Sequence, residues 1–256
     1  MEKKDNKNTI KAVILIVLAL ITIGSIIFGT YRFTGNVKDN IEKVFKEHGI
    51  SINGFGADGY DWEDDDFSSN GNKSIEGSEE FSNLKIDAKV MSITIKNGDK
   101  FNYCCRYNKD KLKPEVTNEN GTLKIVQHGY KNNNGNLKCN LEITVPRYTQ
   151  LDDVCLELNV GEINLEGFDC DTLKVTNNVG EIDIEDINFE ELEAKTNVGE
   201  LSIRTMSSLD EYKINAETNI GELRIGNKNH RHSYSQNGST SKRIKAVTNV
   251  GEVSIR

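Results

Sequence analysis

The sequence predicts an all-β fold, a parallel β-solenoid of short two-strand coils, preceded by one N-terminal transmembrane helix. Three observations support this prediction. A phrase of the form Asn-x-Gly-Glu followed by an apolar residue occurs five times between residues 159 and 255. The residues around each copy alternate between apolar and polar with a period of two, which is typical of strands. One long apolar run without charges lies near the N-terminus.

The apolar run at residues 12–31 predicts a membrane anchor. Twenty residues span about 30 Å as a helix, which is the thickness of the hydrocarbon core. A cleaved signal peptide would have a shorter apolar region of about 7–15 residues and a small-x-small site, and no Ala-x-Ala follows this run. A buried core helix is the other alternative, but the rest of the chain offers little to surround one. We therefore expect an uncleaved signal anchor and a single-pass protein of the cell membrane.

The charges beside this run predict its orientation. Residues 1–11 carry four lysines and two acids, a weak positive excess that favours a cytoplasmic tail and an extracytoplasmic C-terminal domain. The whole chain has a net charge of −8. This acidic balance argues against a nucleic-acid partner, because the phosphate backbone requires a basic face.

Residues 32–78 are expected to connect the anchor to the folded domain. Apolar residues at helical spacing between residues 37 and 45 predict a short juxtamembrane helix. Gly, Ser, Asn and Asp dominate the sequence that follows, which predicts an acidic flexible linker. The acids between residues 58 and 66 offer oxygen ligands for Ca²⁺ but lack the spacing of an EF-hand, so a solvated spacer is expected.

Each copy of the repeated phrase contains a change of parity that predicts a corner in the chain. In the first copy the apolar residues Val154 and Leu156 are at even positions, whereas Ile163 and Leu165 after the glycine are at odd positions. A strand changes the face it buries only where its backbone turns or bulges. Glycine suits such a corner because it tolerates unusual backbone angles and close contacts. The predicted corner glycines are Gly161, Gly180, Gly199, Gly221 and Gly251.

A repeat of about 19–30 residues cannot bury its own apolar face, but stacked copies can. The period of two and the β-branched residues at apolar positions argue against a helical repeat. Identical phrases at constant phase favour parallel stacking, because like residues then align. An antiparallel β-sandwich is the alternative. We assign residues 151–256 to a five-repeat solenoid and residues 79–150 to an irregular β N-terminal part.

The stretch from Leu141 to Pro146, Leu-x-Ile-x-Val-Pro, followed by tandem Asn-(Val/Ile)-Gly-Glu phrases, resembles a bacterial β-strand-repeat family of unknown function whose members are called putative adhesins. The resemblance covers residues 80–256. The family phrase is more often Gly-Ala-Gly-Asp-Ile, so this chain keeps the corner glycine and the acid. The resemblance implies a β-repeat fold and a surface or envelope-stress protein, and it implies no particular activity.

The glutamate after each corner glycine is the strongest candidate for a binding residue. Stacked parallel strands lie about 4.8 Å apart, where two carboxylates repel by about 0.9 kcal/mol in water. Either solvation and corner amides, or a cation, a cationic peptide or a basic envelope partner, offset this repulsion. The asparagines that open the copies are expected to form a structural amide ladder. The candidate acidic row comprises Glu162, Glu181, Glu200, Glu222 and Glu252.

A basic insertion precedes the last copy, between residues 226 and 242. Its side chains offer a binding site for an anionic polymer. Alternatively, the insertion covers the bare edge of the last coil as a cap or forms a plain loop. The candidate basic residues are Lys228, His230, Arg231 and His232.

The cysteines do not form a recognisable framework. The chain has five cysteines, an odd number, and their spacing favours free thiols although a pair outside the cell can oxidise. Parity places Cys105 and Cys139 on core-facing positions and Cys155 on an outer face.

The sequence contains no signature of a zinc protease, a serine hydrolase, a P-loop or a Cys-x-x-Cys redox site. No catalytic residue and no cofactor are therefore predicted, and the protein is expected not to be an enzyme, while metal binding stays open. The expected function is non-catalytic, adhesin-like binding or scaffolding at the cell envelope. The alternative is a sensor of envelope stress or cationic peptides. The expected partners are the membrane, through residues 12–31, and an envelope polymer, a cationic peptide or a membrane protein.

Overall fold

The computed structural model describes residues 73–128 and 137–256. The predicted cytoplasmic tail, the membrane anchor and most of the linker lie outside the described residues. The described chain is an all-β domain in which 15 strands form one hydrogen-bonded network, with two short 3-10 helices, η2 (Asp110–Leu112) and η3 (Leu209–Glu211). No helix in these described ranges is long and apolar enough to cross a membrane.

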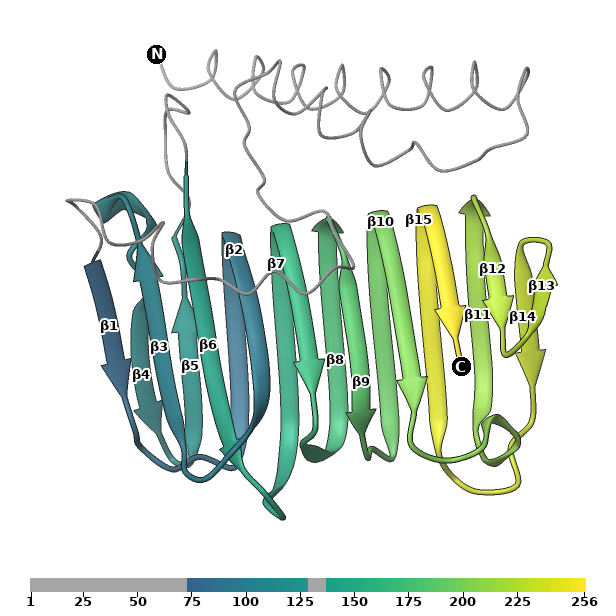
Figure 1. Ribbon diagram of the computed structural model, residues 1–256, viewed down its shortest axis with the longest axis horizontal. Coiled ribbons are helices and arrows are strands. Elements are labelled where there is room, and N and C mark those ends of the chain that lie inside the picture. The colour runs from purple at the N-terminus through teal and green to yellow at the C-terminus, as the bar shows by residue number, and fades with distance from the viewer. Residues whose placement is uncertain (1–72, 129–136) are drawn as a thin grey trace, which may run out of the picture. The chain divides into compact units, whose positions relative to one another are not determined.

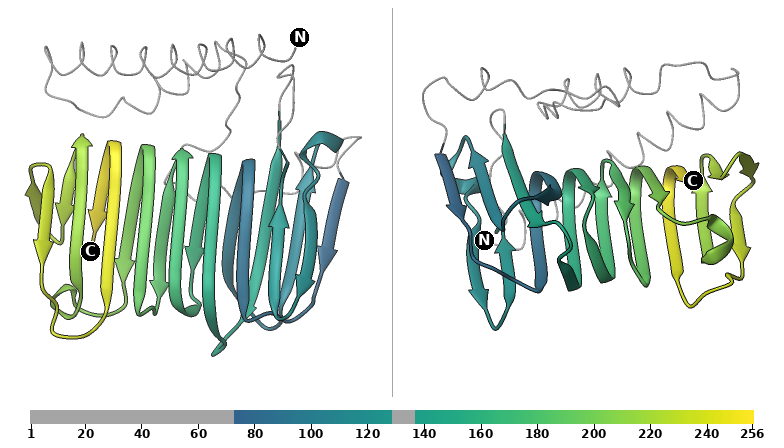
Figure 2. Two further views of the ribbon diagram at one scale, coloured as in Figure 1. Left: turned by 180° about the vertical axis from the view of Figure 1, so that it is seen from behind. Right: turned by 60° about the horizontal axis from the view of Figure 1, so that its bottom comes forward.

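The strands follow one another in a row from β1 at one end to β13 and β14 at the other (Figure 1), and the further views of Figure 2 show the same succession. In chain order the strands are β1 (Lys73–Gly77), β2 (Asn83–Gly98), β3 (Asn102–Tyr107), β4 (Glu115–Glu119), β5 (Thr122–Val126), β6 (Cys139–Pro146), β7 (Gln150–Glu166), β8 (Asp169–Val179), β9 (Ile182–Ile187), β10 (Glu191–Thr205), β11 (Lys213–Ile220), β12 (Leu223–Ile225), β13 (Lys228–His230), β14 (Ser233–Gln236) and β15 (Arg243–Ile255).

Each repeat is one coil with a corner at its glycine. We call the part of a coil before the glycine its first arm and the part after it its second arm. In β7, β10 and β15 a single strand runs through the corner, whereas β8 with β9, and β11 with β12, divide the two arms between two strands. Neighbouring coils pair in parallel and in register, as in β10 and β15, where Gly199 lies opposite Gly251. The predicted solenoid-like stacking is thus confirmed, and the sandwich alternative is wrong for the repeats.

The order of the stack differs from the order of the chain. β15, the last strand, pairs in parallel with β10 on one side and with β11 on the other. The fifth repeat therefore lies between the third and the fourth. β2 forms a complete coil that stacks on β7 along both arms, although it lies in the stretch where the sequence pattern is less regular.

Antiparallel strands cover both ends of the stack. The basic insertion folds back as β13, which pairs with β12, and as β14, which pairs with β11. At the other end β3 pairs antiparallel with β6 and with the edge strand β1. Antiparallel partners leave the end coils without the open, in-register parallel edge on which a further coil would stack.

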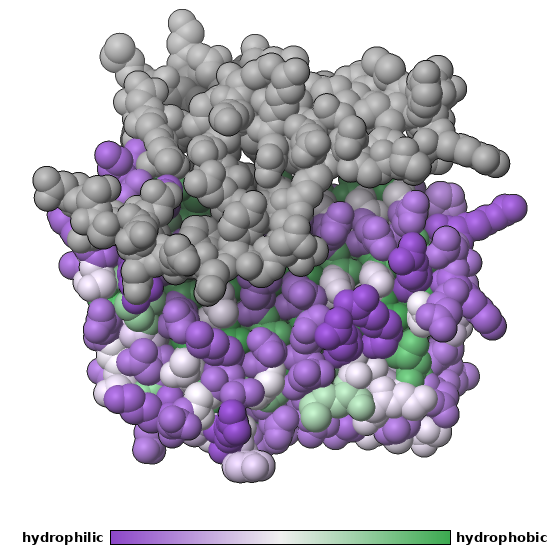
Figure 3. Space-filling model, viewed as in Figure 1, coloured by the Kyte–Doolittle hydropathy of each residue, from purple (hydrophilic) through white to green (hydrophobic). Residues whose placement is uncertain are grey.

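The core lies between the two arms and follows the alternation read in the sequence. In β10, for example, Leu192 and Ala194 of the first arm and Leu201 and Ile203 of the second arm are at most 1% exposed. Each fully buried Leu or Ile stabilises the fold by about 1.5–3 kcal/mol. The intervening side chains point outward, and the face shown in Figure 3 is largely hydrophilic.

The corner glycines are required by both backbone angle and contact distance. All five have φ between +132° and +142°, a region that L side chains rarely adopt. A Cβ at Gly199 would lie 1.9 Å from the carbonyl oxygen of Gly180, and one at Gly251 would lie 1.8 Å from the carbonyl oxygen of Gly199. The glycines thus form a column in which each backbone occupies the space of its neighbour's missing side chain.

In two coils a buried polar residue three positions before the glycine donates a hydrogen bond to this column. The Asn177 side chain donates a hydrogen bond of 2.8 Å to the carbonyl oxygen of Gly161, and the Thr218 hydroxyl donates one of 3.2 Å to that of Gly251. Both polar side chains are 1% exposed. These bonds explain the polar residue at this position in two coils, whereas the buried hydroxyls of Thr196 and Thr248 at the same position have no hydrogen-bond partner.

We expect Gly199→Ala to lower the free energy of unfolding by about 3 kcal/mol or more, because it adds backbone strain to a collision with a carbonyl group. Urea unfolding of the purified chain measures this loss. Gly226→Ala is the matched control, since Gly226 also has a positive φ (+58°) but the nearest atom to an added Cβ is 3.7 Å away. The control should cost only about 1 kcal/mol. Equal losses in the two variants would show that close contact at the corner is not the constraint.

Candidate functional site

The five candidate glutamates lie in one continuous row along the second arm. Glu200 pairs directly with Glu252 in the register of β10 and β15. The others occupy the same position, one residue before the paired apolar residues of β7, β9 and β12. Glu200 and Glu222 are exposed and the other three are half-buried. Because β15 lies between β10 and β11, the row runs in the order Glu162, Glu181, Glu200, Glu252 and Glu222.

Glu252 occupies a position between two other carboxylates of the row. Its burial raises the pKa of the Glu252 carboxyl, the neighbouring Glu200 raises it further, and Glu222 adds to this, while Arg224 acts in the opposite direction. Arg224 lies 3.8 Å from the carboxylate of Glu222. At Glu252, repulsion from the neighbouring carboxylates therefore adds to the cost of burying the charge, and a bound cation would reduce that repulsion.

The acidic row is part of a wider acidic surface on the second arm. Arg204 and Arg256 offset some of this charge, because both approach Glu185, at 3.0 Å and 3.9 Å. Acids still outnumber bases among the outward positions of this arm. The acids are Glu142, Glu162, Glu166, Glu181, Asp183, Glu185, Glu200, Glu222 and Glu252, and the bases are Lys96, Arg204, Arg224 and Arg256.

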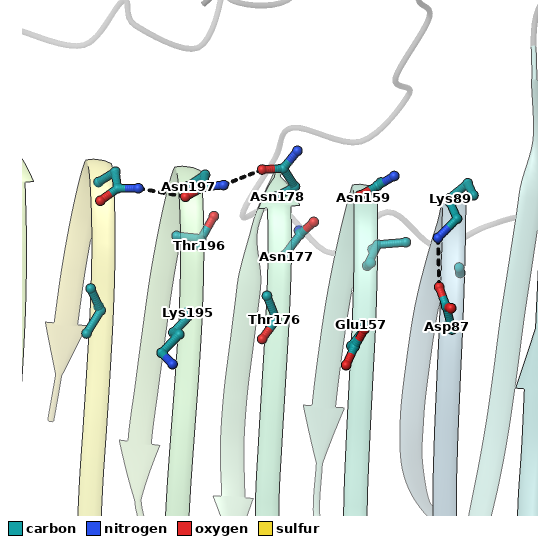
Figure 4. A pocket seen from close by; sticks show the side chains of 14 residues that line it. Asp87, Lys89, Glu157, Asn159, Thr176, Asn177, Asn178, Lys195, Thr196 and Asn197 are labelled. Carbon is teal, nitrogen blue, oxygen red and sulfur yellow. Dashed lines mark hydrogen bonds and ion pairs between the residues drawn. The ribbon is translucent and has the colours of Figure 1, made fainter. Parts of the chain in front are cut away.

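The expected amide ladder is present on the first arm, just before the corner. The Asn219 amide donates to Asn249 at 3.0 Å, Asn249 donates to Asn197 at 2.6 Å, and Asn197 donates to Asn178. Asn159 occupies the next position of the row (Figure 4). Four of the five amides bond a neighbour, so stacking is favourable in this row, whereas like charges meet in the acidic one.

A polar hollow of about 500 Å³ lies beside the amide ladder. It spans the first arms of β2, β7, β8, β10 and β15, and Figure 4 shows its lining. Lys89 at its edge forms an ion pair of 2.9 Å with Asp87. This hollow was not predicted from the sequence, although polar residues recur at these outward positions. Besides the asparagines and these two charges, the lining includes Glu157, Thr176 and Lys195.

The candidate basic residues lie in the antiparallel cap, at the end of the stack where Glu222 ends the acidic row, because His230 pairs with Leu223 directly after Glu222. Lys228 and His230 belong to β13, and Arg231 and His232 form the connection to β14. The His230 ring contacts that of Tyr234 with centroids 4.4 Å apart. The other three side chains are exposed. Over residues 73–128 and 137–256, no three His, Cys, Asp or Glu side chains converge in a way that could hold a metal ion.

Comparison with known proteins identifies the fold family. The Toastrack DUF4097 family matches residues 81–214, just over half of the 256-residue chain. The chain belongs to the Toastrack family. No curated protein matches the chain.

Solved structures were also compared with the chain. A putative cell adhesion protein from Clostridium sporogenes is 18% identical, with a TM-score of 0.53, and the match covers 72% of this chain and 98% of that one. This likeness shows a shared fold. A putative adhesin from Bacteroides fragilis (11% identity, TM-score 0.29, 73% and 98% covered) and a putative lipid binding protein from Parabacteroides distasonis (11% identity, TM-score 0.26, 72% and 97% covered) also match, too distantly to support an argument.

We expect Glu252→Gln to stabilise the Toastrack domain at pH 7 by a small amount, on the order of 0.5 kcal/mol. The pKa of this carboxyl is raised above its ordinary value of 4.5, so the charged form costs folding energy at neutral pH. This cost disappears as the pH falls through the folded pKa. The gain in the variant should therefore vanish near pH 4 in urea unfolding experiments.

Glu217→Gln on the first arm is the matched control for this variant. Glu217 is exposed, and its paired neighbours Val247 and Ser233 are uncharged. The control should change the stability little at either pH. A loss of stability in Glu252→Gln at pH 7 would contradict the account of the row as repulsive.

Proposed function

We propose that this Toastrack protein is a non-catalytic, adhesin-like binding protein of the cell envelope, anchored by residues 12–31 with its β domain outside the cytoplasm. The observation that carries the proposal is the in-register acidic row. Its carboxylates repeat with the spacing of the strands, about 4.8 Å. An extended partner with regularly spaced positive charges would contact several of them at once.

The energetics of the row support a cationic partner. Neighbouring carboxylates repel each other, and the raised pKa of Glu252 reports this cost together with burial. A cation along the row replaces repulsion by attraction without moving the backbone, because the parallel register of β10 and β15 already fixes the spacing. Several weak contacts on one rigid surface add up to a useful affinity.

The hollow on the first arm supports a second ligand class, a neutral envelope polymer. Asn, Thr and paired charges line it, and amides and hydroxyls offer both donors and acceptors to the hydroxyl groups of a glycan. The two arms face opposite directions from the common core. One domain can therefore hold a cationic partner on one face and a polar polymer on the other, as a scaffold requires.

The proposed anchoring and orientation are tested on intact cells that express the full chain. We expect an added protease to remove the β domain from intact cells while a cytoplasmic marker protein stays whole. The anchored N-terminal fragment should remain in the membrane fraction. Protection of the domain until the cells are lysed would overturn the extracytoplasmic location.

The proposed binding surface is tested by calorimetry with the purified full chain, titrated with an extended oligolysine peptide and, separately, with Ca²⁺. We expect the peptide to bind, and its affinity to fall at least tenfold when all five glutamates of the row become glutamine. Binding should also weaken as salt increases, because exposed charges are screened.

A charge-matched variant controls for the change in net charge. It replaces five exposed first-arm acids by amides, and we expect its affinity for the peptide to change less than threefold. Equal weakening in both variants would indicate attraction to the net charge alone, and no binding by the parent would overturn the role of the row. The five replaced residues are Asp152, Asp153, Glu157, Glu191 and Glu217.

A further inference from the structure

The irregular end of the stack brings two thiols together. Cys105 of β3 and Cys139 of β6 have sulfur atoms 3.7 Å apart. They are 0% and 3% exposed, and the alternation of both strands points them into the core. All five cysteines lie within the described residues, and this is the one pair whose sulfurs are in contact.

The strand register explains why these thiols meet. In the antiparallel pair, Cys105 lies opposite Leu141 and Cys139 lies opposite Tyr107. The two cysteines are thus diagonal neighbours on the same face, a relation in which side chains remain within reach of each other. A disulfide needs the sulfurs to approach from 3.7 Å to about 2.05 Å, which side-chain rotation and a small shift between the strands can provide.

We propose that Cys105 and Cys139 form a disulfide that cross-links β3 to β6 when the chain folds under oxidising conditions. The reaction is an exchange with a small-molecule disulfide such as glutathione disulfide. One cysteine thiolate attacks it and releases one glutathione, and the second thiolate attacks the mixed disulfide and releases another. Both thiols lose a proton, and the two electrons are taken up by the glutathione sulfurs.

The other three cysteines have surroundings that do not favour a disulfide. Cys104 points to the opposite face of β3, where its sulfur lies 3.7 Å from Glu76. Cys155 lies on the outer face of β7 between Lys85 and Lys174. Cys170 is fully buried, and burial raises the pKa of its thiol to about 12. None of the three has a second sulfur within contact distance.

The timing of the cross-link follows from the burial of the pair. The contact with Cys139, followed by burial, raises the pKa of the Cys105 thiol, which disfavours its thiolate in the folded domain, and the burial of both side chains shields the pair from oxidant. The exchange is therefore fast during folding and slow in the finished domain. Once formed, the bond closes the chain from β3 through η2, β4 and β5 to β6, which restricts the unfolded state.

The test uses the purified full chain, unfolded in urea and refolded with a mixture of glutathione and glutathione disulfide. Remaining thiols are alkylated, and the digest is analysed by mass spectrometry without reduction. We expect a peptide containing Cys105 joined to the one containing Cys139, and alkylation of the Cys155 and Cys170 peptides. The urea midpoint should rise on oxidation and return on reduction. Alkylation of all five thiols would overturn the proposal.

Two variants identify which of the adjacent cysteines reacts, because Cys104 and Cys105 lie in the same peptide. Cys104→Ala, a change on the outer face, should keep the cross-link and the shift in midpoint, whereas Cys105→Ala should lose both. Loss of the cross-link in Cys104→Ala would also overturn the assignment. The occurrence of the bond in cells rests on the proposed extracytoplasmic location. The cross-link can form on refolding yet be absent from protein that is alkylated inside cells. That result would count against the extracytoplasmic location but not against the pairing of Cys105 with Cys139.

Discussion

The close approach of the corner glycines is the constraint on which the rest of this structure depends. Each glycine carbonyl occupies the space where the next glycine would carry a Cβ, and every glycine of the column has a left-handed φ. The coils can therefore stack only with their corners aligned. A shift by one residue would place a side chain against a carbonyl and turn the buried face of the strand outward. The parallel register of both arms follows from this alignment.

Alignment of the corners also aligns the side chains on either side of them, with opposite consequences. Four of the asparagines two residues before the glycine bond one another along the stack. Asn177 and Thr218, three residues before it, donate hydrogen bonds to the glycine column from within. The glutamates after the glycine meet in the same way but repel. A row of like charges, repeated in all five coils that carry the glycine phrase and costly at Glu252, is the feature of this domain that stability does not explain, and it suggests a ligand.

The two ends of the stack are protected against edge-to-edge association. A solenoid with bare parallel edges could pair with further copies of itself. The chain places antiparallel strands at both ends, β13 and β14 at one and β1 and β3 at the other. It also returns its last repeat to the interior of the stack, so that β15 is held by two neighbours instead of one. The irregular end, where the pairing is antiparallel, is also where two core cysteines meet.

The local features could be predicted from the amino-acid sequence: the two-arm coil, the corner glycine, the buried alternation, the parallel stacking and the two polar rows. The coil, its corner and its buried face follow from periodicity and from the chemistry of single residues such as Gly199. The parallel stacking and the two rows follow from the repetition of the phrase at constant phase. The folded chain was needed to show which copies are neighbours, where the basic insertion folds, that five first arms line a hollow, and that Cys105 meets Cys139. The physical reason is that near-identical phrases can pair with one another almost equally well. Their order in space depends on connection lengths and on contacts between distant segments, which no local pattern records.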